Sequence, residues 1–389
     1  MQNKKVEQPI FTVGRTTTQA KKEEIYHFRY QVYVEELGKT IGCADDTKKW
    51  LTDELDETAI LFFVEVEGKI IATSRMNHGA MTTFSDYWRK IYRLDEFEEY
   101  SKEHISLSSR IMVAKEWRGS LALGSLLFEI FSYARKLGIK FDFCNCSPSL
   151  VEFYEHLGYR RYVDGFMNED MGYLIPLVLL TQDATHLKQV RSPFLRISKQ
   201  LTNNSSETRI WFEEHFSKKE EYINRRLLST QEFWSLLEDK IAKIPTKHIS
   251  LFEGLNEKEI QKFIGMSTII KIKENKVVLR QGDVGNEMFV VLSGVIEVKS
   301  SLEKNGLSLA ILEAGQIFGE MAFVSHSPRN ASVVSVTDSE LLVLTQTFFN
   351  KAIKNSPEIT AKVLFNLSNI LAVRLQVCTQ NWVNSTNSL

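Results

Sequence analysis

The chain has 389 residues, which at about 150 residues per domain suggests two or three domains. Apolar residues make up 43% and charged residues 25%, and the 19 glycines and 7 prolines are too few for a collagen-like or largely disordered chain. The 48 basic residues nearly cancel the 49 acidic ones, so no overall basic excess points to nucleic acid.

Nothing in the sequence predicts export or membrane insertion. The longest apolar run, near residues 174–180, is too short to cross a bilayer, and the first residues lack the apolar core of a signal peptide. Four cysteines, Cys43, Cys144, Cys146 and Cys378, make no disulfide framework in a chain of this length. No second Cys or His pair stands near Cys144 and Cys146 to complete a metal site. We expect Cys144 and Cys146 to be buried structural thiols, in a cytoplasmic protein with reduced cysteines, no metal and no transmembrane segment.

Residues 1–195 alternate helix and strand patterns. Residues 22–37 have the apolar period of a helix, and Gly38 is its stop. Strands mixed with helices in this way predict an α+β layered domain. The other expected elements are a hairpin of strands 59–66 and 69–76 around Glu67-Gly68, a strand at 107–113, a helix at 121–137, a strand at 139–146 and a short helix opened by a capping box at 149–152.

Two further regions follow. Residues 196–245 read as a helical connector that is too rich in aromatic residues to be a flexible tether. Residues 246–389 switch to short strands separated by glycine turns, and a helical pattern over 357–380 closes the chain. This last region predicts a small β-roll with a helix behind it. Its expected strands are 277–279, 288–292, 295–299, 307–312, 331–336 and 340–345.

The most specific motif is FGEMAFVSHSPRNASV at residues 318–333. Gly319 permits positive φ, and a short helical turn after Phe318 would leave N–H groups free for an anion. Glu320 offers a carboxylate to a hydroxyl, and Arg329 offers a planar fork that matches a phosphate. One acid and one arginine placed in this way suit a sugar phosphate. The alternative is a glycine turn with a surface Arg–Glu pair.

The motif closely resembles the phosphate-binding cassette of cyclic-nucleotide-binding domains, and the resemblance extends over about residues 248–375. Residues 280–283, Gly285 and residues 293–294 match the glycine turns of that family. The resemblance implies that Glu320 holds the ribose hydroxyl, that Arg329 holds the cyclic phosphate and that the last helix forms a lid. It implies a pocket that also includes Gly319, Met321, Ala322, Asn330, Ala331 and Ser332.

The resemblance leaves the base open. In eukaryotic members a small residue near position 330 goes with cyclic AMP and Thr goes with cyclic GMP, whereas this chain has Asn330. We favour cyclic AMP as the effector, with cyclic GMP as the alternative. Many bacterial members are transcription factors with a helix-turn-helix after the lid helix. We expect no DNA binding, because about ten residues follow that helix and neither the connector nor the balanced charge supplies a DNA-reading element.

The N-terminal half resembles GNAT acyltransferases in two stretches. WRGSLALG at 117–124 is a glycine-containing turn before a helix, where N–H groups can receive a carrier phosphate, so Arg118, Gly119 and Gly124 are candidates. SLVEFYEHLGY at 149–159 resembles the segment that closes the site, and Tyr154 corresponds to a tyrosine that protonates the leaving thiolate. The alternative for Tyr154 is a packed core residue. The turn departs from the usual glycine pattern, which favours an acyl carrier protein over coenzyme A.

A narrower resemblance is to N-acyl amino acid synthases and acyl-homoserine-lactone synthases, carried by FRYQVY, DELD, SRM and LSSR at 28–33, 53–56, 74–76 and 107–110. Leu107 stands where that family has a Glu, so the general base is unassigned. The alternative is an ion-pair network that holds the first helix on the sheet. The positions that match the family's active site are Arg29, Asp53, Asp56, Arg75, Ser109 and Arg110.

These resemblances predict a GNAT-like acyltransferase domain at 1–195, a helical connector at 196–245 and a cyclic-nucleotide-binding domain at 246–389. The reaction would be aminolysis of an acyl thioester, with phosphopantetheine of an acyl carrier protein or acyl-CoA as donor. A small-molecule amine or a protein lysine would be the acceptor, and nucleotide binding would regulate the transfer allosterically. Two alternatives remain: a cyclic-AMP-gated lysine acetyltransferase that uses acetyl-CoA, and a non-catalytic cyclic-nucleotide effector.

Overall fold

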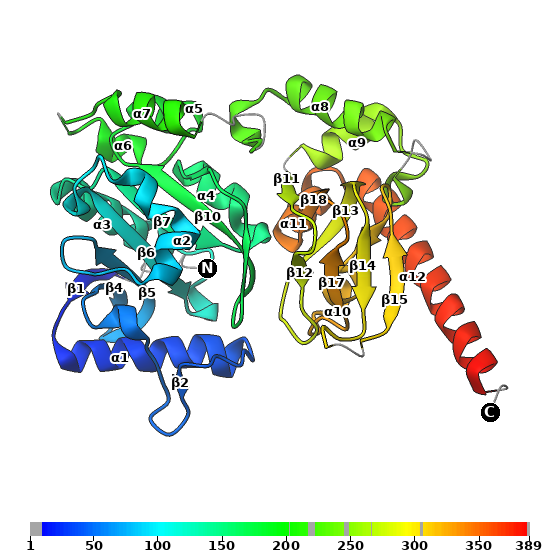
Figure 1. The fold of residues 1–389 in the computed structure, drawn as a ribbon, viewed down its shortest axis with the longest axis horizontal. Coiled ribbons are helices and arrows are strands. Elements are labelled where there is room, and N and C mark those ends of the chain that lie inside the picture. Colours follow the sequence, from blue (N-terminus) through cyan, green and yellow to red (C-terminus); the bar gives the residue numbers. More distant parts are fainter. Residues whose placement is uncertain are drawn as a thin grey trace, which may run out of the picture. The chain divides into compact units, whose positions relative to one another are not determined.

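The computed structural model describes residues 10–201, 203–216, 222–244, 249–265, 267–303 and 306–386. Parts of the expected connector, at 202, 217–221 and 245, therefore lie outside the described residues. The chain divides into two compact units (Figure 1). The first comprises Met1–Asn145, His156–Val163 and Pro176–Ser217, and the second comprises Cys146–Glu155, Asp164–Ile175 and Lys218–Leu389.

A mixed sheet organises the first half of the chain, as expected for an α+β fold. Its strands follow the order β1-β4-β5-β6-β7-β10-β8, and β9 pairs with β10. The pair β6–β7 is parallel, whereas β1–β4, β4–β5 and β5–β6 are antiparallel. The strands are β1 (Thr12–Thr16), β4 (Ile60–Val66), β5 (Lys69–His78), β6 (Ile105–Val113), β7 (Phe141–Cys146), β8 (Arg160–Arg161), β9 (Phe166–Asn168) and β10 (Gly172–Leu180).

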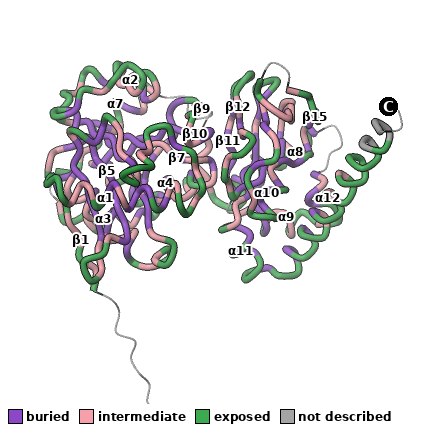
Figure 2. The backbone as a smooth tube through the Cα atoms, turned by 90° about the horizontal axis from the view of Figure 1, so that it is seen from below, coloured by how far each residue is buried: buried purple, intermediate pink, exposed green. Residues whose placement is uncertain are grey.

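Two helices cover opposite faces of this sheet because both faces of its central strands are apolar. On β4, Leu61 and Phe63 pack against Ile25 of α1 (Gln19–Tyr30), which continues as a π-helical segment, Gln31–Glu36. The alternate β4 residues, such as Phe62, pack against Leu126 of α3 (Ala122–Lys136). Figure 2 shows the resulting buried layers. The predicted helices at 22–37 and 121–137 are confirmed to within a few residues.

Shorter elements complete this half. They are β2 (Ala44–Asp45), β3 (Trp50–Leu51), α2 (Asp86–Tyr92), α4 (Val151–Leu157), α5 (Ala184–Gln189), α6 (Leu195–Ser198) and α7 (Glu207–His215). The capping box expected at 149–152 is wrong. Residues Pro148–Leu150 form a 3-10 turn, in which the Ser149 and Ser147 hydroxyls lie 2.9 Å apart, and α4 begins only at Val151.

The second half contains the expected β-roll, built from two four-stranded sheets of order β11-β18-β13-β16 and β12-β17-β14-β15. The six expected strands are confirmed, with shifts of at most one residue at either end. The strands are β11 (Thr268–Ile272), β12 (Val277–Leu279), β13 (Glu287–Ser293), β14 (Ile296–Lys299), β15 (Ser308–Leu312), β16 (Ile317–Phe318), β17 (Ser332–Ser335) and β18 (Ser339–Thr345).

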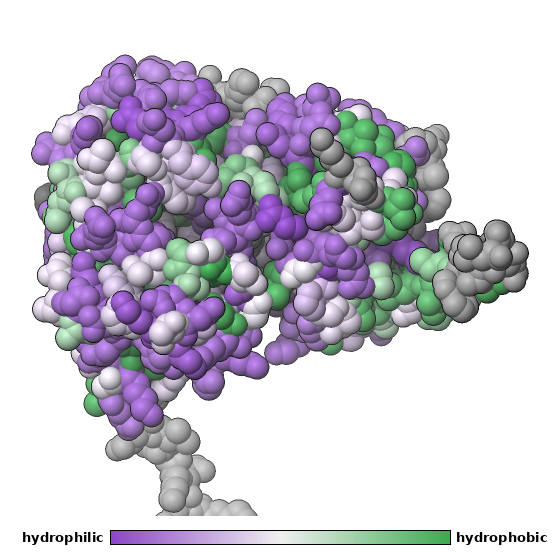
Figure 3. All heavy atoms as spheres, turned by 60° about the horizontal axis from the view of Figure 1, so that its bottom comes forward, coloured by the Kyte–Doolittle hydropathy of each residue, from purple (hydrophilic) through white to green (hydrophobic). Residues whose placement is uncertain are grey.

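Helices cover the roll. They are α8 (Thr230–Ala242), α9 (Glu257–Ile264), α10 (Glu320–Ser325), α11 (Gln346–Asn355) and α12 (Pro357–Thr386). Val363 and Leu367 hold the first turns of α12 in the core, whereas Phe365 and Leu375 are more than half exposed. Figure 3 shows hydrophobic side chains on the visible surface of α12 (right). Among the described residues, no helix combines the length and the hydropathy that a membrane span requires.

The aromatic residues of the expected connector belong to two cores. Trp211 and Phe212 of α7 pack into the cluster that contains Phe141 of β7. Phe233 and Trp234 of α8 pack into the core of the β-roll. This packing explains why the segment is rich in aromatic residues, because each of its helices has its own apolar surface to cover.

Candidate active site and nucleotide cassette

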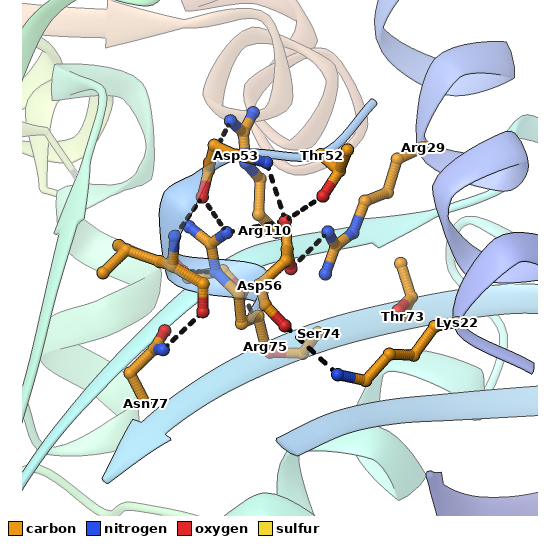
Figure 4. A network of polar contacts seen from close by, with 12 residues as sticks. Lys22, Arg29, Thr52, Asp53, Asp56, Thr73, Ser74, Arg75, Asn77 and Arg110 are labelled. Atoms are coloured by element: carbon orange, nitrogen blue, oxygen red, sulfur yellow. Dashed lines mark hydrogen bonds and ion pairs between the residues drawn. The ribbon is translucent and has the colours of Figure 1, made fainter. Parts of the chain in front are cut away.

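Five charged residues meet on one face of the first sheet and form the Arg–Asp network: Arg29, Asp53, Asp56, Arg75 and Arg110 (Figure 4). Helix α1 supplies Arg29, β5 supplies Arg75 and β6 supplies Arg110. A 3-10 turn, Glu54–Asp56, supplies both carboxylates. The sequence placed these residues near one site, and the structure brings them together.

The turn fixes both carboxylates through its own backbone. Asp53 Oδ1 accepts from Leu55 N at 3.0 Å, and Asp56 Oδ2 accepts from Asp53 N at 3.0 Å, which makes a reciprocal capping box. Each carboxylate therefore faces the arginines in a set orientation.

Ion pairs link the members of the Arg–Asp network in series. Arg29 Nη1 lies 2.8 Å from Asp56 Oδ1, and Arg75 Nη1 lies 2.9 Å from Asp56 Oδ2. Arg75 also contacts Asp53, whose other oxygen lies 2.8 Å from Arg110 Nη2. Arg29, Asp56 and Arg75 are at most 2% exposed.

The charges of the network govern the ionisation of its members. Burial raises the pKa of Asp53, but the charges of Arg75 and Arg110 outweigh it and hold that pKa well below its ordinary value. The pKa of Asp56 is lowered in the same way by Arg29 and Arg75, again against burial. Burial lowers the pKa of Arg29, and Asp56 opposes that effect. Both carboxylates are therefore charged at neutral pH.

A bulge in β6 brings Ser109 and Arg110 to the same face. Neighbouring strand residues normally point to opposite faces, but Arg110 has φ 55 and the β5–β6 register shifts between Thr73 and Arg75. As a result Ser109 Oγ accepts from Arg75 Nε at 3.0 Å while Arg110 reaches Asp53.

The Arg–Asp network carries three positive and two negative side chains. Within the described residues, Nε and Nη2 of Arg29 are buried and have no hydrogen-bond partner. An unbalanced buried positive charge is unfavourable without an anion nearby. The more accessible members are Arg110 and Asp53, whose side chains are 15% and 21% exposed.

Leu107, which stands where the related synthases have a glutamate, is a core residue. Leu107 is 3% exposed and lies in the aromatic cluster with Phe97 and Phe143. The ladder between β6 and β7 covers only Ile105–Leu107 and Phe141–Phe143 in the described structure. Among the described residues, β6 has no ladder to β7 beyond Leu107, although it stays paired with β5 on its other side.

Asp142 of β7 is a buried carboxylate that the sequence reasoning missed. It is 2% exposed and accepts hydrogen bonds from Ser106 at 2.6 Å, Ser108 at 2.9 Å and Tyr159 at 2.5 Å. Burial raises its pKa to about 6, although these three hydroxyls lower it. The sequence signal for this buried carboxylate is a single charged residue within the apolar run FDFC.

The turn at 117–124 is only partly open for a phosphate. Arg118 Nη2 lies 2.5 Å from Glu36 Oε1, and Arg118 Nε donates to Val113 O at 3.1 Å. Gly119 has φ 85 with open space around it, whereas Gly124 lies inside α3 and not in the turn. Tyr154 is 7% exposed on α4, beside Phe153, and belongs to the second unit.

A cavity of about 450 Å³ opens at the far end of β5. Phe84, Phe97 and Tyr100 line it together with Thr82. Asn77 Nδ2 donates to Thr82 Oγ1 at 3.3 Å and to Leu55 O at 2.6 Å, so the cavity adjoins the turn that carries Asp53 and Asp56. Its size falls in the range of small-molecule sites.

In the second unit, the expected glycine turn and short helix are present. Gly319 has φ 80 and caps α10, which begins at Glu320. The Arg329 guanidinium donates to Gly319 O at 2.9 Å and to Glu287 Oε1 at 3.0 Å. Glu320 Oε1 lies 2.5 Å from Arg374 Nη1 of α12. Glu320 and Arg329 are 3% and 4% exposed, so both sit inside the fold rather than on its surface.

The remaining cassette residues surround this pair. Ser332 Oγ accepts from Gln281 N at 3.0 Å, and Gln281 Nε2 donates to Asn330 O at 3.3 Å. Met321 is 50% exposed and Ala322 is buried, whereas Ala331 is half-buried and Asn330 is exposed. Arg374 and Glu287 are contacts that the sequence reasoning did not anticipate, because each lies far along the chain from the motif.

Comparison with known families gives one match in each half of the chain. Residues 24–183 match the family described as N-acyl amino acid synthase FeeM. Residues 269–356 match the cyclic nucleotide-binding domain family. The chain therefore carries an N-acyl amino acid synthase domain of the FeeM type, followed by a cyclic nucleotide-binding domain.

Two similar proteins each cover about a third of this chain or less. The chain is 32% identical over 127 residues to a cyclic AMP receptor protein of Thermus thermophilus, covering 32% of this chain and 57% of the relative. It is 32% identical over 102 residues to a cAMP-dependent protein kinase regulatory subunit of Blastocladiella emersonii, covering 26% of this chain and 25% of the relative. This chain thus spans little more than half of the first relative and a quarter of the second.

Two solved structures each align with less than half of this chain. A cyclic nucleotide-binding domain from Methylobacillus flagellatus aligns with a TM-score of 0.34 and 22% identity, covering 40% of this chain and 85% of that one. A catabolite activator protein of Thermus thermophilus aligns with a TM-score of 0.32 and 30% identity, covering 35% of this chain and 63% of that one.

Proposed function

We propose that this chain is a cyclic-nucleotide-regulated N-acyltransferase that transfers an acyl group from a carrier thioester to the amino group of an amino acid. The proposed domains are a GNAT-like acyltransferase at 1–195, a helical connector at 196–245 and a nucleotide-binding domain at 246–389. The observation that carries the proposal is the excess of one positive charge in the Arg–Asp network, together with the FeeM-type match over residues 24–183.

The charge excess favours an acceptor with a carboxylate. Among the described residues, the ion pairs of Arg29, Arg75 and Arg110 are made with Asp53 and Asp56, and one more negative charge would balance the site. An amino acid brings that charge next to the amine that must react. The carboxylate of the acceptor would bind first at Arg110, which is the most exposed arginine of the network and also contacts Asp53. Arginine also binds a carboxylate through two parallel bonds, which fixes the orientation of the amine.

The cavity beside Thr82 supports a bulky substrate. Phe84, Phe97 and Tyr100 offer an apolar wall, and the chain of contacts from Thr82 through Asn77 leads to the Asp53 turn. We propose that it receives the body of a substrate whose reactive end lies at the Arg–Asp network.

The donor is proposed to be an acyl carrier protein rather than coenzyme A. Arg118 is already paired with Glu36, and Gly124 lies within α3, so this turn offers few free groups for a pyrophosphate. A phosphopantetheine arm carries a single phosphate and needs fewer donors. Acyl-CoA remains the alternative donor.

In the proposed reaction, the neutral amine nitrogen attacks the thioester carbonyl carbon and forms a C–N bond. The carbonyl oxygen becomes an oxyanion, for which the proposed donors are backbone N–H groups on the side of β6 that faces β7, after the described β6–β7 ladder ends at Leu107. The C–S bond then breaks, the sulfur leaves as a thiolate and takes a proton, and the amine loses one. Tyr154 is the proposed proton source, and no side chain is assigned as the base.

Arg110→Ala tests the acceptor site. It should lower acyl transfer from an acyl carrier protein by roughly 100-fold, because a positioned cation next to the reacting groups is lost. The matched control is Arg15→Ala, which removes an exposed ion pair with Glu129 in the same unit and should leave the rate unchanged. An amine lacking the carboxylate should react poorly compared with its parent amino acid.

Three results would redirect the proposal. Equal rates for the amino acid and the decarboxylated amine would contradict the carboxylate site. A strong preference for acetyl-CoA and protein lysines would favour a lysine acetyltransferase. No turnover with any thioester would favour a non-catalytic nucleotide effector.

The effector is proposed to be cyclic AMP. The relatives from Thermus and Blastocladiella are named for cyclic AMP, which supports the proposal. In it Glu320 would accept from the ribose hydroxyl and Arg329 would bind the cyclic phosphate. Binding should be measured by calorimetry with cyclic AMP and cyclic GMP in parallel, and tighter binding of cyclic GMP would reverse the assignment.

A further inference from the structure

The glycine turn at residues 280–285 touches two features of the second unit at once. One is Arg329 of the nucleotide cassette, and the other is the β9–β10 hairpin within Asp164–Ile175, which belongs to this unit by its contacts. A segment that contacts a ligand-binding residue and a second element is placed to relay a change from one to the other.

The turn wraps around Arg329. Gly282 N donates to Arg329 O at 2.8 Å, and Arg329 N donates to Asp283 O at 2.8 Å. A methyl group added at Gly285 would lie 2.4 Å from Arg329 Nη2, so the turn backbone also lies against the guanidinium. A shift of Arg329 therefore has to be accommodated by this turn.

The same turn holds the hairpin. Arg280 Nη1 donates to Glu169 O at 2.6 Å at the hairpin tip. Asn168 shapes that tip, because its Oδ1 accepts from Asp170 N at 3.1 Å and from Met171 N at 2.9 Å. A methyl group added at Gly172 would lie 3.0 Å from Asp283 Oδ2.

The hairpin leads directly into the catalytic sheet through its own strand. β10 begins in the second unit with Gly172–Ile175 and continues in the first unit from Pro176 to Leu180. In the sheet β10 lies next to β7, the strand that separates from β6 after Leu107. β10 therefore connects the hairpin tip covalently to a neighbour of the strand that borders the proposed oxyanion donors.

We propose that Arg280 couples nucleotide occupancy at Arg329 to the β9–β10 hairpin and, through β10, to the opening between β6 and β7. Without nucleotide the Arg329 guanidinium binds Glu287 and Gly319 O, and a cyclic phosphate would draw it into a second arrangement. The proposal rests on the proposed function of both sites.

The test compares the wild type with Arg280→Ala and with Lys362→Ala, which removes an exposed ion pair to Glu259 in the same unit. Cyclic AMP binding is measured by calorimetry, and amide hydrogen exchange is followed over residues 164–175 with and without cyclic AMP. Acyl transfer is measured under the same conditions. In the wild type and in Lys362→Ala, cyclic AMP should change both the exchange of the hairpin and the transfer rate, by about 5- to 150-fold for the coupled equilibrium.

In Arg280→Ala, cyclic AMP should bind with an affinity within about threefold of the wild type, because the phosphate ligands are intact. Its effect on hairpin exchange and on the transfer rate should be lost. An Arg280→Ala protein that binds cyclic AMP and still shows the full exchange response would overturn the proposal. If exchange responds in the wild type but no thioester is turned over, the relay stands and the proposed acyltransferase function fails. If acyl transfer responds to cyclic AMP while hairpin exchange does not, the function stands and the relay fails.

Discussion

The Arg–Asp network and the nucleotide cassette both set arginines against carboxylates, but they differ in charge balance. In the cassette Arg329 faces Glu287 and Arg374 faces Glu320, so each cation has its own anion. The Arg–Asp network has three cations and two anions. An anionic ligand of the cassette has to compete with ion pairs that already exist. An anion that binds the Arg–Asp network instead supplies the negative charge that the network lacks. The difference predicts that the cassette responds to its ligand by rearrangement and that the network binds its ligand with little movement.

The largest effect is expected for Arg29→Ala. Arg29 is fully buried and pairs with Asp56, so its removal deprives that buried carboxylate of one of its two cations, at a cost of about 3–5 kcal/mol in the free energy of unfolding. Arg110→Ala should cost far less stability, because Arg110 is partly exposed. Urea denaturation of both variants measures the contrast. Equal losses would mean that the two arginines have the same structural role.

The next effect concerns Asp142 and has a defined pH range. Its carboxyl has a folded pKa of about 6 against an ordinary value of 3.8. The folded state therefore holds this proton more tightly than the unfolded chain, and the free energy of unfolding falls by about 3 kcal/mol as pH rises from below 4 to above 6. Asp142→Asn removes this dependence, so the variant should gain stability relative to the wild type over that range. Parallel pH curves for the two proteins would contradict the assignment.

A smaller effect is expected for Arg329→Ala, which should lower cyclic AMP affinity by about 2–3 kcal/mol, or roughly 30- to 150-fold, through loss of a charge-assisted phosphate pair. Because Glu287 is then left buried without its cation, thermal unfolding has to be measured on the same sample. Arg329→Lys keeps the charge without the planar fork and should recover stability more than affinity. Wild-type affinity for cyclic AMP in a folded Arg329→Ala protein would contradict the assignment of Arg329 as the phosphate ligand.

The smallest effect is expected for Glu320→Ala. It removes contacts to a neutral hydroxyl, which contribute about 0.5–1.5 kcal/mol to binding. The same change frees Arg374 from its contact with Glu320. Calorimetry should rank Glu320→Ala between the wild type and Arg329→Ala, and a loss larger than that of Arg329→Ala would reverse the proposed roles.

The cassette was predictable because its chemistry is contiguous in sequence. Residues 318–333 contain the glycine, the acid and the arginine, and local spacing alone places them around one turn. Glu287 and Arg374 were not predictable, because their contacts depend on how β13 and α12 pack.

The Arg–Asp network was predictable only as a set of residues. Their pairing depends on the bulge at Arg110, which no periodicity reveals, and strict alternation along β6 would place Ser109 and Arg110 on opposite faces. Long elements such as α3 and β5 were found from their apolar periods. The two-residue strand β16 and the short helix α2 were not, because so few residues carry no period.

The backbone at Arg110 has a further consequence. A residue other than glycine at φ 55 is held in the left-handed region, which costs on the order of 1 kcal/mol relative to glycine. Arg110→Gly would relax that strain while it deletes the guanidinium. At this position the fold therefore gives up backbone stability to hold a guanidinium beside Asp53.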